Sequence, residues 1–90
     1  MPTPFKQWLD RLPSAREKFY VVREGGKWRI RHDGILHGPY LIPGEAMRVA
    51  VNKAHFAGRQ GGGAQVYEQV QQNEFRLAWT YGLDPYPSQL

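Results

Sequence analysis

The sequence predicts an α+β fold, in which an antiparallel sheet of about five strands carries one long helix on one face. Three observations predict it. Two alternating runs flank Gly25-Gly26, one long amphipathic stretch fills residues 43–58, and a polar run and then an alternating run follow that stretch. The expected order is β-β-β-α-β-β, preceded by a short N-terminal helix. We expect one domain: helix and connector over 1–18, core over 19–81 and a proline-rich tail over 82–90.

The N-terminal helix is predicted over residues 3–13. Thr3 suits the cap, Pro4 suits the first helical position, and Pro13 ends the helix. Apolar side chains recur at three- and four-residue spacing, which predicts one docking face: Phe5, Trp8, Leu9 and Leu12.

The clearest local signal is a hairpin over residues 19–24 and 27–32. Gly25-Gly26 can adopt the positive φ angles of a two-residue turn, and this loop length pairs Glu24 with Lys27 and Val22 with Arg29. One face should then hold Phe19, Val21, Trp28 and Ile30. The other should hold Tyr20, Val22, Glu24, Lys27, Arg29 and Arg31. Trp28 is predicted to be a core residue beneath the helix, near Ala50 and Ala54.

The third strand is expected over residues 35–42, interrupted near Gly38-Pro39. The helix follows over 43–58, where Pro43 and Glu45 suit its start and Gly58 suits its end. Its apolar stripe is rich in alanine, so it can lie close to the sheet: Ala46, Met47, Ala50, Val51, Ala54 and Ala57.

A glycine-rich loop follows this helix, with Gly61, Gly62 and Gly63 in succession. Phosphate-binding loops precede a helix, because the free N–H groups of a helix N-terminus hold the anion. This loop has the reverse order, so we interpret it as a flexible connector in which serine at position 62 should be tolerated. A polar strand over 64–72 and a strand over 75–82 come next. In the latter, Phe75, Leu77, Trp79 and Tyr81 should share one face.

The net charge of +4 is concentrated in the first third of the chain. Up to Arg31 there are eight basic and three acidic residues, which gives a net charge of +5. The remainder of the chain has four basic and five acidic residues, which gives −1. A local positive field attracts polyanions. Lys27, Arg29 and Arg31 project from one side of a single strand, and such a ridge can enter a DNA groove or follow phosphates.

Enzymatic chemistry is not expected. The chain has no cysteine, which excludes thiolate metal sites and cysteine nucleophiles, and no serine occurs in a nucleophile motif. A histidine-dependent enzyme would need His32, His37 and His55 to converge in a pocket, and no carboxylate stands at a metal-ligand spacing such as H-E-x-x-H. We therefore expect no cofactor, no metal and no membrane segment, and a cytoplasmic location.

The favoured interpretation is a small non-catalytic binding module that binds DNA or RNA through Tyr20, Lys27, Arg29 and Arg31. A solvated sheet face with no partner is the simplest competing interpretation of these cations. A second class is a protein-interaction or self-assembly module that uses an open sheet edge, or the aromatic end formed by Trp79, Tyr81 and Tyr86.

Two resemblances accompany this interpretation. The stretches "YVVREGGKWRIRHDG", "PGEAMRVAVNKAHFAG" and "AWTYGLDPYP" resemble a family of small bacterial domains of unknown function, which implies a sheet with one packed helix. The region from Gly25 to Gly58 is also similar to AP2-type and integrase arm-binding domains, which read DNA with the outer face of a three-stranded sheet. That resemblance implies DNA contacts for Arg29 and Arg31. The third strand broken at Gly38-Pro39 and the strands after the helix depart from it.

Overall fold

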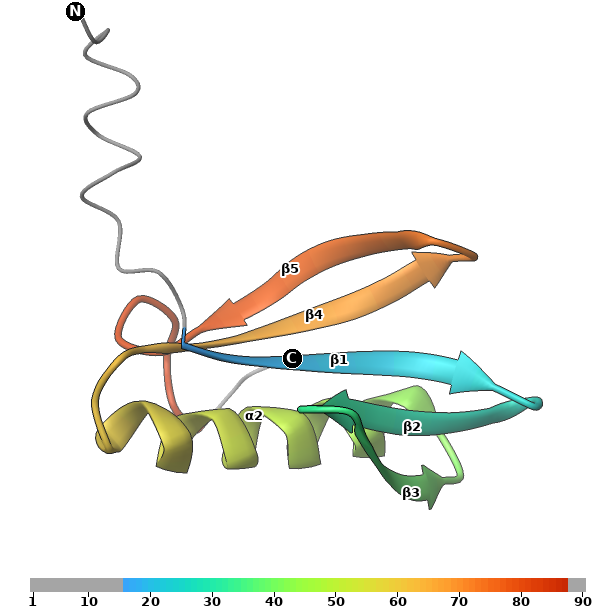
Figure 1. Ribbon diagram of the computed structural model, residues 1–90, viewed down its shortest axis with the longest axis horizontal. Helices are drawn as coiled ribbons and strands as arrows, with labels where there is room; N and C mark the ends of the chain where they lie inside the picture. The colour runs from blue at the N-terminus through green and yellow to red at the C-terminus, as the bar shows by residue number, and fades with distance from the viewer. Residues whose placement is uncertain (1–15, 88–90) are drawn as a thin grey trace, which may run out of the picture.

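The structure, a computed structural model, describes residues 16–87 and contains a five-stranded sheet with one helix across it (Figure 1). The elements in chain order are β1 (Glu17–Glu24), β2 (Lys27–His32), β3 (Ile35–Tyr40), α2 (Pro43–Arg59), β4 (Ala64–Gln71) and β5 (Glu74–Thr80). The strand order across the sheet is β3-β2-β1-β4-β5. The expected α+β class is confirmed, and the N-terminal helix expected over 3–13 lies outside the described residues.

The prediction of a purely antiparallel sheet is wrong, because β1 and β4 pair in parallel. The cause is α2, which runs back across the sheet after β3. A strand that follows such a helix starts at the same end of the sheet as the strand before it, so the crossover connects parallel strands. The hairpins already occupy one side of β1, and β4 pairs with its free side, from Glu17↔Ala64 to Val21↔Glu68.

The register of the first hairpin is as predicted, with Glu24 opposite Lys27, Val22 opposite Arg29 and Val21 opposite Ile30. Gly25 and Gly26 both have positive φ angles, of 60° and 77°. In β3 the pairing shifts between Trp28↔Tyr40 and Ile30↔His37, which puts the irregularity at Gly38-Pro39 where it was expected.

The core lies between α2 and one face of the sheet. The helix contributes the predicted stripe, and Ala50 and Ala54 have no exposed surface, which lets the helix lie close to β1 and β4. The sheet contributes buried side chains from four strands: Phe19, Val21, Ile30, Ala64, Val66 and Trp79. Trp28 lies on this face as predicted, but it is half-buried at the margin of the core. Trp79, only 2% exposed, is the large central side chain instead.

A bulge in β5 changes which side chains share a face. Val66 pairs with Trp79, but the next β4 residue, Tyr67, pairs with Leu77, so Ala78 is an extra residue. The alternation therefore reverses at this point. Trp79 enters the core beside Val66, whereas Leu77 lies on the opposite face with Tyr67. The prediction that Phe75, Leu77 and Trp79 share one face is wrong for this reason.

The glycine loop after α2 is more constrained than a flexible connector. Gly61, Gly62 and Gly63 all have positive φ angles, and the carbonyls of Gly62 and Gly63 accept hydrogen bonds from the N–H groups of Arg16 and Glu17. The loop thus fixes the start of β1. Serine at position 62 would adopt a φ near 89° only under strain, so the expectation that it is tolerated is not supported. The N–H of Gly61 donates to the Gly58 carbonyl, as in a helix C-terminus.

Gly58 provides a stability test of the contact between helix and C-terminal segment. A Cβ at this position would lie 2.3 Å from Cγ of Tyr81. Gly58→Ala should therefore lower the free energy of unfolding by about 1–3 kcal/mol through overpacking, although alanine is the better helix former. The matched control is Gly44→Ala, where a Cβ meets nothing within 4 Å and stability should be unchanged or higher. Urea unfolding of both variants measures the difference, and equal stabilities would contradict the packing described.

Candidate nucleic-acid interface

The face of the sheet opposite α2 carries the residues predicted to bind nucleic acid. Tyr20 pairs with Arg31 across β1 and β2, and Arg29 and Lys27 follow on the same side. The intervening residues Val21 and Ile30 are fully buried against α2, which fixes the orientation of both strands. Within residues 16–87 no helix or other segment covers this side of the sheet, which we call the open face (Figure 1).

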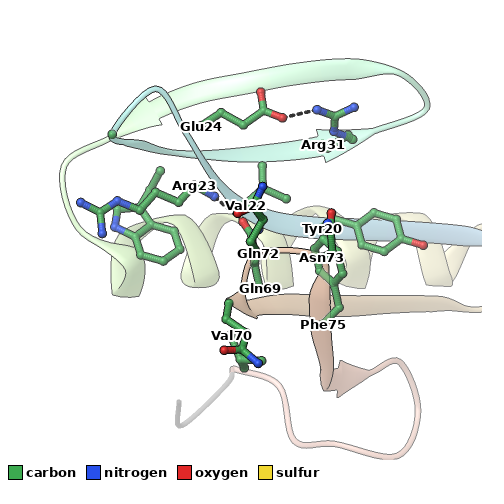
Figure 2. Close-up of a pocket in the computed structure, with 13 residues that line it drawn as sticks. Tyr20, Val22, Arg23, Glu24, Arg31, Gln69, Val70, Gln72, Asn73 and Phe75 are labelled. Atoms are coloured by element: carbon green, nitrogen blue, oxygen red, sulfur yellow. Dashed lines mark hydrogen bonds and ion pairs between the residues drawn. The ribbon is translucent and has the colours of Figure 1, made fainter.

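The cations of the open face are not equivalent. The guanidinium of Arg31 donates to the carboxylate of Glu24 in an exposed ion pair (Figure 2). Arg29 and Lys27 form no ion pair with any residue in the 16–87 range, and Lys27 is exposed. Glu24 therefore neutralises one of three positive charges. An exposed ion pair of this kind is weak and can exchange its carboxylate for a phosphate.

The structure adds an aromatic cluster that the sequence did not predict. The rings of Tyr20 and Tyr67 stack with centroids 5.2 Å apart, and Phe75 meets Tyr20 edge-on at 5.5 Å. The parallel pairing of β1 with β4 places Tyr67 beside Tyr20, and the bulge at Ala78 turns Phe75 and Leu77 to the same face. Phe75 is 43% exposed and Leu77 48%. The open face is thus aromatic at its centre and cationic along β2.

A large cleft opens at one end of this face, between the two hairpins. The pairing of β1 with β4 ends at Val21↔Glu68, and beyond it the strands diverge (Figure 1). The cleft has a volume of about 1070 Å³. At its base the backbone N–H of Arg23 donates to Oε1 of Gln69 at 2.9 Å, so a side chain replaces the missing strand partner.

The lining of the cleft combines three kinds of side chain (Figure 2). Tyr20 and Phe75 extend the aromatic cluster into it, and Arg23 lies 6.0 Å from the centre of the Trp28 ring. The tip of the β4–β5 hairpin supplies amides: Gln69, Gln71, Gln72 and Asn73. Amide groups hydrogen-bond the edges of nucleobases, and aromatic and guanidinium planes stack on their faces.

The three histidines do not meet in one pocket. His32 and His37 lie on β2 and β3, near enough to interact, whereas His55 is on α2 and stacks on Tyr86 at 3.6 Å. Burial lowers the pKa of His37, and the charges of Lys53 and His32 lower it further. The large cleft contains no histidine.

The aromatic end proposed for protein contacts is mostly occupied within the chain. Trp79 is buried and its Nε1–H donates to the carbonyl of Pro85 at 3.0 Å, and Tyr81 packs against the core. Tyr86 stacks on His55 and its hydroxyl donates to Asn52 at 3.1 Å. The tail up to Pro87 thus folds back onto α2.

Within residues 16–87, α2 is too short and too polar for a membrane-spanning helix. Comparison of the chain with protein-family models, with curated proteins and with solved structures finds no match. The resemblances to a small bacterial family and to AP2-type domains stay predictions, and the functional argument depends on the open face alone.

Proposed function

We propose that the chain is a non-catalytic module that binds single-stranded nucleic acid on the open face of its sheet. The observation that carries the proposal is the aromatic cluster of Tyr20, Tyr67 and Phe75, which lies directly beside the cations of β2. Single strands are bound by this combination, because unpaired bases stack on aromatic rings while the backbone follows positive charge.

A single strand fits these residues better than a duplex. In a duplex the base faces are stacked on one another, so aromatic side chains on a sheet gain nothing from them. Of the three predicted cations, Arg31 forms an ion pair with Glu24, so the ridge on β2 attracts duplex phosphates less strongly than three unpaired cations would. The amide-lined cleft next to Phe75 adds groups that recognise the edges of splayed-out bases.

The proposal is tested by fluorescence anisotropy with labelled single-stranded DNA, single-stranded RNA and duplex DNA at about 50 and 200 mM salt. We expect tighter binding of the single strands. The fold should be kept in Arg29→Ala/Arg31→Ala, because Arg31 is exposed and Arg29 is half-buried outside the core. Substitutions at the surface usually shift stability by about 0.5 kcal/mol or less. The slope of the logarithm of the binding constant against the logarithm of the salt concentration should become shallower by about 1.4. Each phosphate contact on a single strand contributes about 0.7 to this slope, and the variant loses two contacts.

A matched control is Arg48→Ala/Arg59→Ala, which removes two exposed cations from α2 on the other side of the sheet. Its affinity should stay within about twofold of the wild type, because a distant exposed charge acts weakly in salt. Absence of binding at the lower salt, or equal losses in the two double variants, would refute the assignment of the open face.

A second candidate function is self-assembly through β5. This strand is an edge of the sheet, and its own Leu77 and Val70 of the neighbouring β4 are each 48% exposed. Exposed edge strands pair readily with other chains. Analytical ultracentrifugation would detect a dimer, and Leu77→Lys should dissociate it while leaving the monomer folded.

A further inference from the structure

A second group of functional side chains lies at the end of β1 away from the large cleft. Glu17 at the start of β1 meets His32 at the end of β2, with 2.5 Å between Oε2 and Nε2. Oδ2 of Asp33, in the following turn, is 3.6 Å from the same nitrogen. These three atoms all lie within 4.8 Å of one another. Three side chains from two strands and a turn therefore converge on one point.

The core fixes the position of the imidazole in this cluster, while the side chain of Asp33 is 75% exposed. The pairing of Tyr20 with Arg31 brings the next residues, Phe19 and His32, together, and the imidazole stacks on the buried Phe19 ring at 4.0 Å and 13°. Asp33 has a φ of 50° in the two-residue turn that it forms with Gly34, which sets the direction of its side chain. The imidazole is thus held with Nε2 toward both carboxylates. The side chains of His32 and Glu17 are 22% and 28% exposed, which leaves access for an ion.

The cluster has more negative charge than its single imidazole can satisfy. One Nε2–H can donate to one carboxylate at a time, and neither Glu17 nor Asp33 forms an ion pair with lysine or arginine in the part of the chain described. With a neutral imidazole the group has two negative charges. A divalent cation at the point of convergence would neutralise both and use the free Nε2 lone pair as a third ligand.

We propose that Glu17, His32 and Asp33 bind a Zn²⁺ ion. Zinc accepts imidazole nitrogen and carboxylate oxygen at about 2.0–2.2 Å, and tetrahedral ligands at this distance are about 3.4 Å apart. The separation of Nε2 from Oδ2, 3.6 Å, already matches. Glu17 has to withdraw by about 1 Å, within the reach of its side-chain torsions. Water completes the coordination. Mg²⁺ and Ca²⁺ prefer sites made wholly of oxygen and should bind weakly.

The site is separate from the open face, so it can be tested independently of the proposed function. Glu17 and His32 lie on the side of the sheet that faces α2, in register with Phe19 and Ile30. Spacing along the chain could not predict this site, because 15 residues separate Glu17 from His32 and only strand pairing joins them.

The test is isothermal titration of the untagged protein with Zn²⁺ and with Mg²⁺, because a histidine tag would itself bind zinc. We expect one zinc per chain and no measurable Mg²⁺ binding. Asp33→Asn keeps a residue that tolerates the positive φ of the turn but removes the charged ligand. The dissociation constant for zinc should therefore rise at least tenfold. His32→Gln should abolish binding, and the control Glu74→Gln, at the far hairpin, should bind as the wild type does.

Nuclear magnetic resonance of the imidazoles provides a second measurement, which does not depend on the heat of binding. Zinc should shift the His32 signals and leave those of His55 in place, because His55 lies on α2 beside Tyr86. The proposal is overturned if the wild type binds no zinc, if His32→Gln binds it equally well, or if zinc shifts His55 instead of His32.

Discussion

Replacing Trp79 with alanine is expected to lower the free energy of unfolding by about 3–5 kcal/mol. The side chain is 2% exposed and lies in the core with Val66 and Tyr81. It also donates a hydrogen bond to the carbonyl of Pro85, so its loss both opens a cavity and releases the C-terminal segment. Small domains have a total stability of about 5–15 kcal/mol, so this single change removes a large share of it.

Trp28→Ala is the matched control for this prediction. Trp28 is only half-buried at the margin of the same core, and the guanidinium of Arg23 lies over its ring. Its removal should lower the free energy of unfolding by about 1–2 kcal/mol. Urea unfolding followed by circular dichroism compares the two. A larger loss of unfolding free energy in Trp28→Ala than in Trp79→Ala would show that the assignment of the central core residue is wrong.

The second large effect is expected for nucleic-acid affinity in Phe75→Ala. The ring is 43% exposed and meets Tyr20 edge-on at the rim of the cleft. Stacking of one base on an aromatic side chain contributes about 1–3 kcal/mol, so the dissociation constant for a single strand should rise about 5- to 150-fold. The free energy of unfolding should fall less than in Trp79→Ala, because Phe75 lies on the open face and is not part of the core.

Phe56→Ala is the control for this substitution. Phe56 is 57% exposed on α2, so it is a phenylalanine at least as accessible as Phe75 on the other side of the sheet. Its removal should leave single-strand affinity within about twofold of the wild type, as expected for exposed sites away from the ligand. Anisotropy titrations of the two variants side by side make the comparison. Equal losses of single-strand affinity in the two variants, or no loss in Phe75→Ala, would exclude base stacking at the aromatic cluster.

Local patterns predicted the elements of this fold but not their assembly. Alternation and the Gly25-Gly26 turn fixed the register of the first hairpin, because turn length alone sets which residues pair. The direction of β4 depends on where α2 returns the chain, which is a tertiary effect. The alternation of apolar and polar residues along β5 gives no sign of the bulge at Ala78. Because of this bulge, Phe75 and Trp79 lie on opposite faces of the sheet.

The candidate site was predictable to the same degree. Tyr20, Lys27, Arg29 and Arg31 share a face because they alternate along two strands joined by a tight turn. Tyr67 could be added only by knowing which strand lies beside β1, and Phe75 only by knowing the bulge. The hydrogen bond from Trp79 to the Pro85 carbonyl similarly depends on the C-terminal segment folding back, which composition does not reveal.

The most direct test of the open face as the binding surface is an amide chemical-shift titration of ¹⁵N-labelled protein with a short single strand. We expect the largest shifts on β1, β2 and β4, at Tyr20, Arg29, Arg31 and Tyr67, together with residues that line the cleft. Amides of α2, such as those of Arg48 and Phe56, should barely move. Shifts centred on α2, or none at saturating oligonucleotide, would contradict the proposed function.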